Sequence, residues 1–385
     1  MDKFIKSTSE TPVKVLYVID TLETGGAERS LLEIASRLLH LTPVVCHLYQ
    51  GETLKPKFET AGIKVISIDL KGSYQFIQAY KELKKVCLTE KPDLIVSALY
   101  RSEIISRVVA RKLRIVQIGS LVSDSYSENK KSTFTFLGRL KFKIFYWINV
   151  LTAGLSAAYI ANSESIKLSS SKALKIPLDK IHTIYRGRTV KANPGTRQAD
   201  AMPLKFLNVG RLIKGKGQSE LIQAFAKFLQ SNPESTLTIA GDGPYRPELE
   251  HLIVLNKLVN KVYLLGNIDN VSQLYIDHDC LVFPSHYEGF SGVLVEAMLH
   301  KIPVLASDIP MNLEAIVHNK TGYIFTVKNE DSILKAMEWF YTHRDNATVF
   351  AEEAYKEACR RFDSNVIVRQ HEDLYSEVVG KFYSQ

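Results

Sequence analysis

Two glutamates flank a segment that has the features of an anion-binding site. The segment PSHYEGFSGVLVEA follows the apolar run CLVFP, so we expect a strand, a loop containing Glu288, and a helix with Glu296 in its first turns. Backbone N–H groups at a helix start attract anions. Here they belong to Ser291, Gly292, Val293 and Leu294. Because two carboxylates would repel a phosphate bound alone, the pattern favours a central diphosphate with a hydroxyl-rich sugar on each side.

Two cations lie on a glycine-containing turn earlier in the chain. After the run KFLNV, the segment GRLIKGKG at 210–217 contains Arg211 and Lys216, five residues apart. Such a turn can bring the forked guanidinium of arginine and the point charge of lysine onto one diphosphate. The spacing differs from that of a P-loop, which reads G-x-x-x-x-G-K-[ST]. A diphosphate clamp is the interpretation we favour for this loop.

Two further turns follow strand-like runs and are less specific. TGGAER at 24–29 comes after VKVLYVID, and its glycines allow a ligand to approach the backbone at a helix start. A merely structural turn would have the same sequence. GDGP at 241–244 comes after TLTIA, and its proline can open the next helix. In that turn, Asp242 can also serve only to stabilise the backbone.

Short β-branched runs alternate with helical patterns along most of the chain, which predicts parallel sheets with helices on both faces. Strands are expected at 13–20, 44–49, 63–69, 93–99, 115–119, 159–162, 181–185, 205–209, 236–240, 262–265, 280–284 and 304–307. Helices are expected near 27–39, 74–90, 102–112, 138–155, 165–175, 217–231, 246–258, 271–278, 293–300, 330–343 and 364–383.

The alternation stops at a polar, strand-poor stretch and then starts again, which predicts two doubly wound α/β domains of the Rossmann-like kind. We place the first at 1–188, a linker at 189–203, and the second at 204–362. The segment 363–385 is expected to form a final helix that packs on the first domain. Ligands of such sheets bind at the carboxyl ends of the strands, so the default site is a central cleft that both domains face.

Several motifs together resemble the retaining GT-B glycosyltransferases of family four, a broad set also called glycosyl transferases group 1. Besides the turns at 24–29, 210–217 and 241–244, they are VYLLG at 262–266, E-G-F-x(5)-E-A-M at 288–298 and IPVLASD at 302–308. They occur in both halves in the expected order. The resemblance implies transfer of a hexose-type sugar from a nucleotide-diphosphate sugar, with UDP- and GDP-sugars favoured, to a glycan or lipid-linked acceptor. It also implies retention of anomeric configuration and a place in surface polysaccharide or glycolipid assembly.

The resemblance implies roles for individual residues as well. Arg211 and Lys216 would bind the donor diphosphate and stabilise it as it leaves, and Glu288 would hydrogen-bond the transferred sugar near the reacting carbon, so these three are the catalytic candidates. Glu296 would bind the hydroxyls of the nucleotide ribose. The other expected donor-binding residues are Gly25, Gly26, Gly241, Gly266, Ser291, Gly292, Val293 and Leu294. The first domain would face the acceptor and the second the donor.

Some positions depart from the family pattern. Many members have a histidine after a middle strand of the first domain, where this chain reads VQIGSL at 116–121, and Ser120 or Asp124 is the candidate replacement. The usual N-G-V/I-D before the linker is Tyr185-Arg186-Gly187-Arg188, which adds two cations near the expected cleft. His300-Lys301 stands where a small residue and a glycine are usual.

No metal or other cofactor is expected. The sequence Asp277-His278-Asp279 has the form of a D-x-D metal site, but it lies at the end of a predicted helix, where acids commonly cap the helix or face solvent. A sugar-nucleotide epimerase is an alternative on a similar fold, yet it needs acid/base groups spread between its domains. A catalytically silent binding protein is another, although the charged residues at 211, 216, 288 and 296 are all present. Formation of a new glycosidic product would distinguish transfer from both.

Composition and charge narrow the class further. The chain has 385 residues, 45% hydrophobic and 23% charged, which excludes a disordered or collagen-like protein. Its four cysteines are widely spaced, so neither a zinc cluster nor a disulfide framework is expected. The amino terminus has no apolar core of a secretory signal, so a cytoplasmic protein is expected, peripheral on the inner membrane face.

The positive charge is concentrated in the first half, which suggests an anionic partner. Residues 1–190 contain 29 Lys and Arg against 17 Asp and Glu, a net charge of +12, whereas residues 191–385 carry −4. No nucleic-acid-binding motif accompanies the charge, so nucleic acid is not expected as a partner. The stretch 144–163 has no charged residue and the length of a membrane span, but its pattern favours a helix followed by a short strand.

An anionic membrane surface is the partner we expect for this half. Cations and aromatic residues are interleaved before and within the helix predicted near 138–155, and no acidic residue occurs between 129 and 163. The residues are Lys130, Lys131, Arg139, Lys141 and Lys143 with Phe134, Phe136, Phe142, Phe145, Tyr146 and Trp147. Such a pattern suits docking on anionic lipid. The alternative is that the aromatic residues belong to the core and the cations are only solvated.

Overall fold

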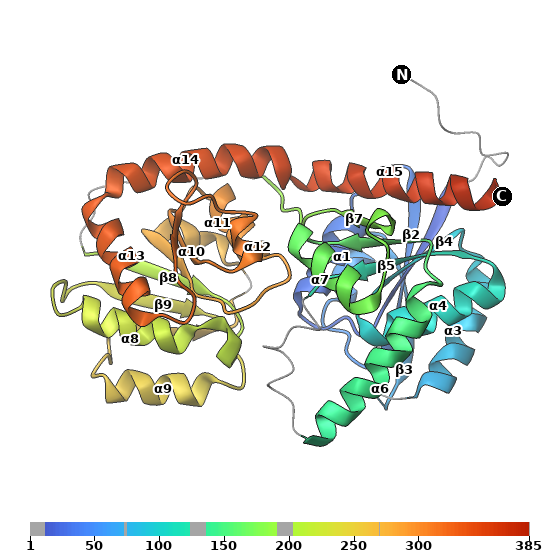
Figure 1. Cartoon of the computed structure of the whole chain (residues 1–385), viewed down its shortest axis with the longest axis horizontal. Helices are drawn as coiled ribbons and strands as arrows, with labels where there is room; N and C mark the ends of the chain where they lie inside the picture. Colours follow the sequence, from blue (N-terminus) through green and yellow to red (C-terminus); the bar gives the residue numbers. More distant parts are fainter. Residues whose placement is uncertain (1–11, 73–74, 124–135, 191–202, 269, 385) are drawn as a thin grey trace. The chain divides into compact units, whose positions relative to one another are not determined.

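The chain forms two compact units, which are described here one at a time. The computed structural model describes residues 12–72, 75–123, 136–190, 203–268 and 270–384, with residues 136–141 described by their backbone alone. The first unit combines Met1–Tyr185 with Ser364–Gln385, and the second is Arg186–Asp363. Figure 1 labels the elements along the chain.

The first unit is built on a seven-stranded parallel sheet. Its strand order is β3-β2-β1-β4-β5-β6-β7, so the chain starts in the middle, runs to one edge, and then returns to extend the other side. The strands are β1 (Val13–Ile19), β2 (Leu41–Tyr49), β3 (Lys64–Leu70), β4 (Leu94–Ala98), β5 (Val116–Leu121), β6 (Ala158–Ala161) and β7 (Ile181–Thr183). This is a doubly wound sheet, as predicted, and its topological switch lies between β1 and β4.

The second unit repeats the design with a six-stranded parallel sheet. Its order is β10-β9-β8-β11-β12-β13, with the switch between β8 and β11. The strands are β8 (Lys205–Val209), β9 (Thr236–Ala240), β10 (Val262–Gly266), β11 (Cys280–Phe283), β12 (Val304–Ser307) and β13 (Tyr323–Phe325). Strand β13 was not predicted.

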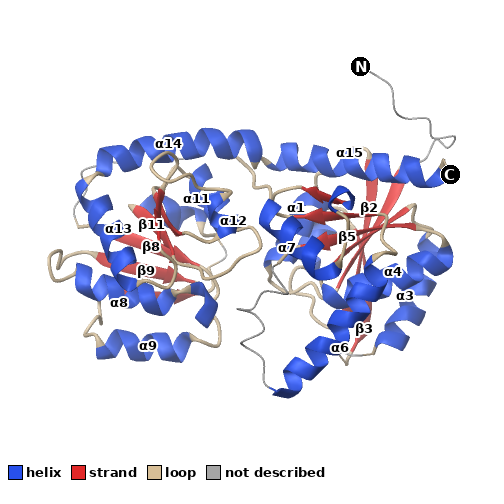
Figure 2. Ribbon diagram, in the orientation of Figure 1, coloured by secondary structure: helices blue, strands red, loops and turns tan. Residues whose placement is uncertain are grey.

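Helices cover both faces of each sheet (Figure 2). In the first unit they are α1 (Gly26–Ala35), α2 (Lys55–Thr60), α3 (Phe76–Glu90), α4 (Tyr100–Leu113), α6 (Phe136–Ala153), α7 (Glu164–Leu174) and α15 (Ser364–Tyr383). In the second unit they are α8 (Gln218–Phe228), α9 (Arg246–Leu255), α10 (Ser272–Asp277), α11 (Gly292–Leu299), α12 (Pro310–Leu313), α13 (Glu330–Thr342) and α14 (Arg344–Arg361). The short helices α2 and α12 and the longer helix α14 are not among the helices predicted by residue range.

Strand β1 shows why the first sheet needs helices on both faces. Val15 and Tyr17 pack in a cluster with Tyr375 of α15, whereas Leu16 and Val18 belong to a second cluster that includes residues of α3 and α4. All of these side chains are buried. A strand that is apolar on both faces is typical of the centre of a parallel sheet.

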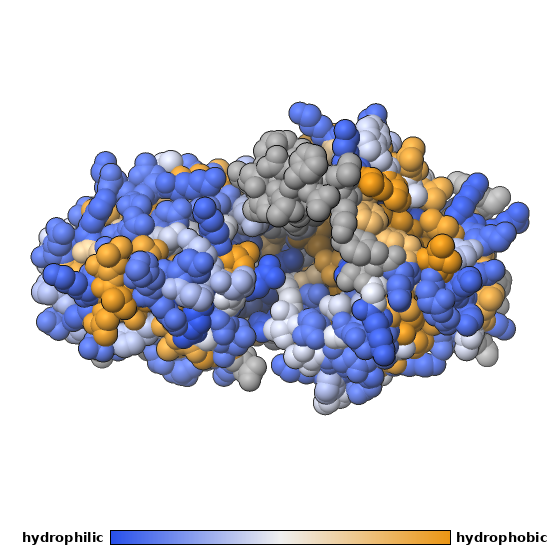
Figure 3. All heavy atoms as spheres, turned by 90° about the horizontal axis from the view of Figure 1, so that it is seen from below, coloured by the Kyte–Doolittle hydropathy of each residue, from blue (hydrophilic) through white to orange (hydrophobic). Residues whose placement is uncertain are grey.

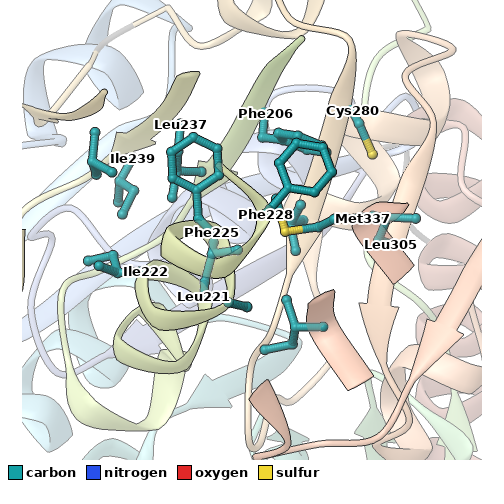
Figure 4. Close-up of a cluster of buried hydrophobic side chains, with 14 of the residues drawn as sticks. Phe206, Leu221, Ile222, Phe225, Phe228, Leu237, Ile239, Cys280, Leu305 and Met337 are labelled. Atoms are coloured by element: carbon teal, nitrogen blue, oxygen red, sulfur yellow. The ribbon is translucent and has the colours of Figure 1, made fainter. Parts of the chain in front are cut away.

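Aromatic packing organises the core of the second unit (Figure 4). Phe206 of β8 meets Phe228 of α8 edge to face, with the ring centroids 5.3 Å apart. Phe225 and Met337 complete the same cluster from α8 and α13. This core fixes β8 and α8, and therefore also the loop between them that contains the two candidate cations.

Helix α15 returns to the first unit after the chain has built the second. Its residues Ile367, Leu374 and Tyr375 join the core cluster of the first sheet. The buried carboxylate of Glu372 accepts hydrogen bonds from the backbone N–H groups of Leu39 and His40, at 2.7 and 2.9 Å. The last helix thus supplies partners for backbone groups directly before β2.

The boundary between the units lies before Arg186, slightly earlier than the sequence pattern placed it. The N–H of Arg188 donates to the carbonyl of Phe362 at 2.9 Å, and Arg188 forms a parallel bridge with Asp363. These bonds tie the segment after β7 to the end of α14, so the segment belongs to the second unit.

The uncharged stretch at 144–163 forms the end of α6 and strand β6. Among the described residues, no helix has the length and apolar character needed to cross a membrane. The predicted helix followed by a strand is therefore confirmed.

We expect Glu372→Ala to destabilise the first unit. The change leaves two N–H groups without their acceptor, which typically costs about 1–3 kcal/mol. Denaturant unfolding, together with amide hydrogen exchange at Leu39 and His40, measures the loss. Asp373→Ala is the matched control, because Asp373 lies on the same helix but is exposed. Equal effects of the two changes would contradict this account of α15.

Candidate functional site

The candidate donor-binding loops of the second unit follow neighbouring strands. The loops after β9, β8 and β11 contain residues 241–244, 210–217 and 284–291, and these three strands are adjacent in the sheet. Because carboxyl ends of parallel strands meet at one edge, the sheet itself brings the loops together.

Glycines let these loops pack backbone against backbone. Gly217 has φ +69°, and a Cβ there would overlap the carbonyl oxygen of Pro284. Gly241 has φ +137°, its Cβ would overlap the carbonyl oxygen of Gly210, and its N–H donates to Gly266 at 2.7 Å. A side chain at either position would separate the loops, so their contact depends on glycine.

An ion pair joins the loop after β8 to the loop after β11. The ammonium group of Lys216 donates to Oε1 of Glu288, and the exposed fractions of the two side chains are 18% and 12%. The N–H of His286 donates to the carbonyl of Gly215 at 2.9 Å, and the ring of Tyr287 covers the same glycine. The structure therefore brings two of the three predicted catalytic residues into direct contact.

His286 gives the loop after β11 a second attachment. Its Nε2 atom lies 3.0 Å from Oε1 of Glu220 on α8. Burial raises the pKa of Glu220, but hydrogen bonds from His286 and Ser219 outweigh it and lower the pKa to about 2. The sequence analysis did not single out this contact, since neither residue belongs to a recognisable motif.

Arg211 differs from Lys216 in its surroundings. Its side chain is exposed, and among the described residues its guanidinium forms no ion pair or hydrogen bond. Unlike Lys216, Arg211 therefore remains available to a ligand.

The second glutamate, Glu296, lies on α11 between two donors. Its Oε1 atom accepts from Nε of Arg188 at 2.6 Å, and its Oε2 atom accepts from the hydroxyl of Tyr275 at 3.2 Å. Burial raises the pKa of Tyr275, and the negative charge of Glu296 adds to the shift. Helix α11 begins at Gly292 with Ser291 as N-cap, so the four predicted amides do lie at a helix start.

The two glycines of the first unit lie at the start of α1. Gly25 is the N-cap in an extended conformation, and a Cβ there would overlap the buried carboxylate of Glu28. Gly26 is the first residue of the helix and is exposed. The need for glycine at Gly25 is thus explained within the unit, and this contact neither requires nor excludes a ligand.

The carboxyl edge of the first sheet carries polar groups that the sequence analysis missed. Asp20, directly after β1, accepts from Nε of Arg101 at 2.8 Å and from the N–H of Ser102 at 2.9 Å. Ser120 donates its N–H to Glu103 at 2.9 Å. The signal was available, because Asp20 and Arg101 each follow the end of a strand.

The candidate replacements for the family histidine remain a prediction. Ser120 lies at the end of β5. Asp124 lies outside the described residues, as do Lys130, Lys131 and Phe134 of the expected membrane-binding segment.

The D-x-D sequence has structural partners in the second unit. Asp279 accepts from the N–H of Lys205 at 2.7 Å, and the ring nitrogens of His278 lie 2.8 Å from Leu274 O and from Thr238 Oγ1. Asp277 accepts from Gln273 at 2.8 Å. These bonds give each of the three residues a partner within the second unit.

One other cluster has the composition of a metal site. His47, Glu52 and Asp69 bring potential ligand atoms within 4.8 Å of one another in the first unit. The ammonium group of Lys55 lies 3.0 Å from Oε1 of Glu52 and 3.1 Å from Ser67. The ammonium group of Lys55 thus already supplies positive charge to the carboxylate of Glu52.

Each half of the chain matches a family model of known proteins. The family model "Glycosyltransferase Family 4" matches residues 24–191, and the model "Glycosyl transferases group 1" matches residues 191–357. The chain is 28% identical over 259 residues to "Uncharacterized glycosyltransferase MJ1607" of Methanocaldococcus jannaschii, a match that covers 62% of this chain and 65% of that protein.

Two full-length similarities agree with this assignment. The chain is 24% identical over 383 residues to the Campylobacter jejuni protein "GalNAc-alpha-(1->4)-GalNAc-alpha-(1->3)-diNAcBac-PP-undecaprenol alpha-1,4-N-acetyl-D-galactosaminyltransferase", covering 95% of this chain and 99% of that one. The crystal structure of Anabaena Alr3699/HepE in complex with UDP superposes with a TM-score of 0.82 at 23% identity, covering 95% and 100% of the two chains. The two family models together match residues 24–357 and both sheets have the doubly wound order, so the chain has the GT-B fold, and its first part matches glycosyltransferase Family 4 and its second part glycosyl transferases group 1.

Proposed function

We propose that this glycosyltransferase moves a hexose-type sugar from a nucleoside-diphosphate sugar to a glycan or lipid-linked acceptor, with retention of anomeric configuration. The observation that carries the proposal is the edge of the second sheet. There, the exposed Arg211, the Lys216–Glu288 pair and the start of α11 lie on or directly after loops of adjacent strands. The second unit would take the donor and the first the acceptor.

The donor is proposed to be a UDP-sugar, with a GDP-sugar as the other candidate. Crystal structures of Anabaena Alr3699/HepE contain UDP and UDP-glucose. A lipid-linked acceptor is suggested by the name of the Campylobacter jejuni relative, which specifies a glycan on diphospho-undecaprenol. Surface polysaccharide or glycolipid assembly would be the corresponding process.

The chemistry asks the protein to stabilise a leaving diphosphate. When the bond between the sugar and the phosphate breaks, negative charge grows on the departing oxygen, and preorganised cations and N–H groups lower the barrier. Arg211, Lys216 and the amides of Ser291, Gly292, Val293 and Leu294 would have this role, with Gly241 and Gly266 lining the donor site. No metal is proposed, because the two cations already offer the positive charge that a metal would supply.

The two glutamates would divide the work between sugar and nucleotide. Glu288, held by Lys216, would hydrogen-bond the transferred sugar near its reacting carbon. Glu296, held by Arg188 and Tyr275, would accept hydrogen bonds from the ribose. This arrangement matches a ligand that is anionic at its centre and rich in hydroxyl groups at both ends.

We further propose that α6 docks the enzyme on an anionic membrane. Ile144, Trp147, Leu151 and Leu155 recur at helical spacing, with exposed fractions of 55%, 48%, 78% and 42%, and Lys143 beside them is exposed. Figure 3 shows hydrophobic side chains gathered on this side of the first unit. An exposed apolar stripe next to cations is typical of a helix that lies on anionic lipid.

The aromatic residues of this segment divide between the core and the surface. Phe145 stacks on Phe76 at a centroid distance of 5.3 Å, and the hydroxyl of Tyr146 donates to Ala173 at 2.9 Å. Trp147 is half exposed. The side chains of Phe136, Arg139 and Lys141 are not among those the structure describes. Trp147 is therefore the aromatic residue of α6 best placed for lipid contact.

The transfer activity and the role of Arg211 are tested together. We expect the wild-type enzyme to form a new glycosidic product from a UDP- or GDP-sugar, detected by mass spectrometry after screening donors by thermal shift. Arg211→Ala should lower kcat/KM, and the ratio of the two values should correspond to a loss of about 2–4 kcal/mol of transition-state stabilisation. The unfolding temperature should change little. Lys214→Ala, which removes an exposed cation from the same loop, is the control. Near-wild-type turnover by Arg211→Ala would remove it from the mechanism.

The two glutamates should differ in what they bind. Glu296→Gln should weaken affinity both for the free nucleoside diphosphate and for the intact donor, because its contact is with the ribose. Glu288→Gln should leave affinity for the free nucleoside diphosphate nearly unchanged and reduce kcat, because its contact is with the sugar. Calorimetry and steady-state kinetics measure the contrast. The role assignment would be wrong if both changes had equal effects on nucleotide binding.

Membrane docking predicts selective binding to vesicles. The protein should co-sediment with phosphatidylglycerol-containing vesicles at low salt and much less with neutral vesicles or at high salt, since each cation near the surface contributes about 1 kcal/mol. Leu151→Glu should weaken the binding, whereas Val254→Glu, at an exposed position on α9, should not. Binding that ignores lipid charge and salt, or no binding at all, would refute docking while leaving the transfer activity in place.

A further inference from the structure

Arg188 occupies a position that the family resemblance does not explain. Its guanidinium lies against the first residue of α11, where a Cβ at Gly292 would overlap Nη2. Its Nε atom donates to Glu296 at 2.6 Å, and its Nη1 atom donates to the carbonyl of Gly187 at 2.8 Å. The side chain is mostly buried, with 17% exposed. The backbone bond from Arg188 to Phe362 anchors the residue within the second unit.

A cation at this place needs a compensating charge. The amino end of a helix carries partial positive charge, so a guanidinium against Gly292 is unfavourable by itself. Glu296 lies one turn further along the same helix and supplies the opposite charge. The two side chains together form a neutral unit beside the helix start.

The same contact leaves Glu296 able to accept further hydrogen bonds. A carboxylate has about four lone-pair directions. Arg188 uses one on Oε1 and the buried Tyr275 uses one on Oε2. One direction on each oxygen remains, which is what two neighbouring hydroxyl groups of a ribose require. The two donors also fix the plane of the carboxylate.

Neutralisation matters because a diphosphate is proposed to bind at the same helix. Without a cation beside it, the carboxylate of Glu296 would repel that diphosphate, because solvent screens the charge of a half-buried group poorly. The Lys216–Glu288 pair meets the corresponding need for the other glutamate. Each carboxylate that flanks the proposed anion site therefore has its own cation.

We propose that Arg188 is a positioning residue for nucleotide binding, which orients Glu296 toward the ribose and cancels its charge so that the diphosphate can bind beside it. The inference rests on the proposed function. It assigns Arg188 no contact with the reacting atoms, and its whole effect passes through Glu296. That restriction makes it testable by a double-mutant cycle.

The experiment measures dissociation constants of UDP, GDP and uridine by calorimetry or ligand-observed NMR. The variants are Arg188→Gln, Arg188→Lys, Glu296→Gln and the double variant Arg188→Gln/Glu296→Gln, each checked for folding by thermal unfolding. Arg186→Gln is the control, since it removes a cation two positions away. Salt is varied to separate charge from shape.

Arg188→Gln should weaken binding of the nucleoside diphosphate roughly tenfold and binding of uridine by a smaller factor, because uridine loses only the orientation of Glu296, whereas the diphosphate is also repelled by its charge. The defect should shrink at high salt, and Arg188→Lys should restore part of the affinity. In the Glu296→Gln background, removing Arg188 should have no further effect. A merely structural role would instead weaken UDP and uridine alike and persist in that background.

The experiment distinguishes failure of the proposed function from failure of the role proposed for Arg188. A wild-type protein that binds neither UDP nor GDP would overturn the proposed function and this inference with it. If the wild type binds one of them while Arg188→Gln binds it equally well or more tightly, the role of Arg188 alone is overturned. Additive effects in the double variant would also overturn it.

Discussion

The need to compensate half-buried carboxylates governs the candidate site. Glu288 and Glu296 both lie where solvent screens charge poorly, and each is paired with a cation from a different part of the second unit. Lys216 comes from the loop after β8, and Arg188 comes from the segment that follows β7. The ion pairs therefore connect the loops as well as neutralise them. A single uncompensated carboxylate would both loosen this edge of the sheet and repel an anionic ligand.

Sheet direction and glycine place those ion pairs. Three adjacent parallel strands end at one edge, and their loops come into backbone contact where Gly217 and Gly241 remove the side chain that would hold them apart. Once the backbones touch, Tyr287 can cover Gly215, and Lys216 can reach Glu288. The charged groups are thus positioned by a rigid scaffold rather than by flexible loops, as a preorganised site requires.

Features that depend on neighbouring residues could be predicted from the sequence, whereas contacts between residues far apart in the chain could not. Twelve strands were predicted from short β-branched runs, and each corresponds to a strand of the structure. Strand β13, at the edge of the second sheet, was missed. Glu288 and Glu296 could be singled out from their spacing, but the partner of Glu296 is 108 residues away, and no pattern links Arg188 to it. Long-range pairing of this kind depends on the fold, so only the structure could show it.

The charged side chains at the carboxyl ends of the strands have different partners in the two units. This difference agrees with the proposal that the first unit takes the acceptor and the second the donor. In the described part of the first unit, Asp20 is saturated by Arg101 and Ser102, and Glu103 accepts from Arg107 and Ser120. These groups stabilise the ends of β1 and β5 within the unit. In the second unit Arg211, in the loop after β8, keeps an exposed guanidinium. An exposed guanidinium suits a diphosphate, whereas Asp20 and Glu103 are held by partners of their own unit, so the hydroxyl groups of an acceptor would gain nothing from breaking those bonds.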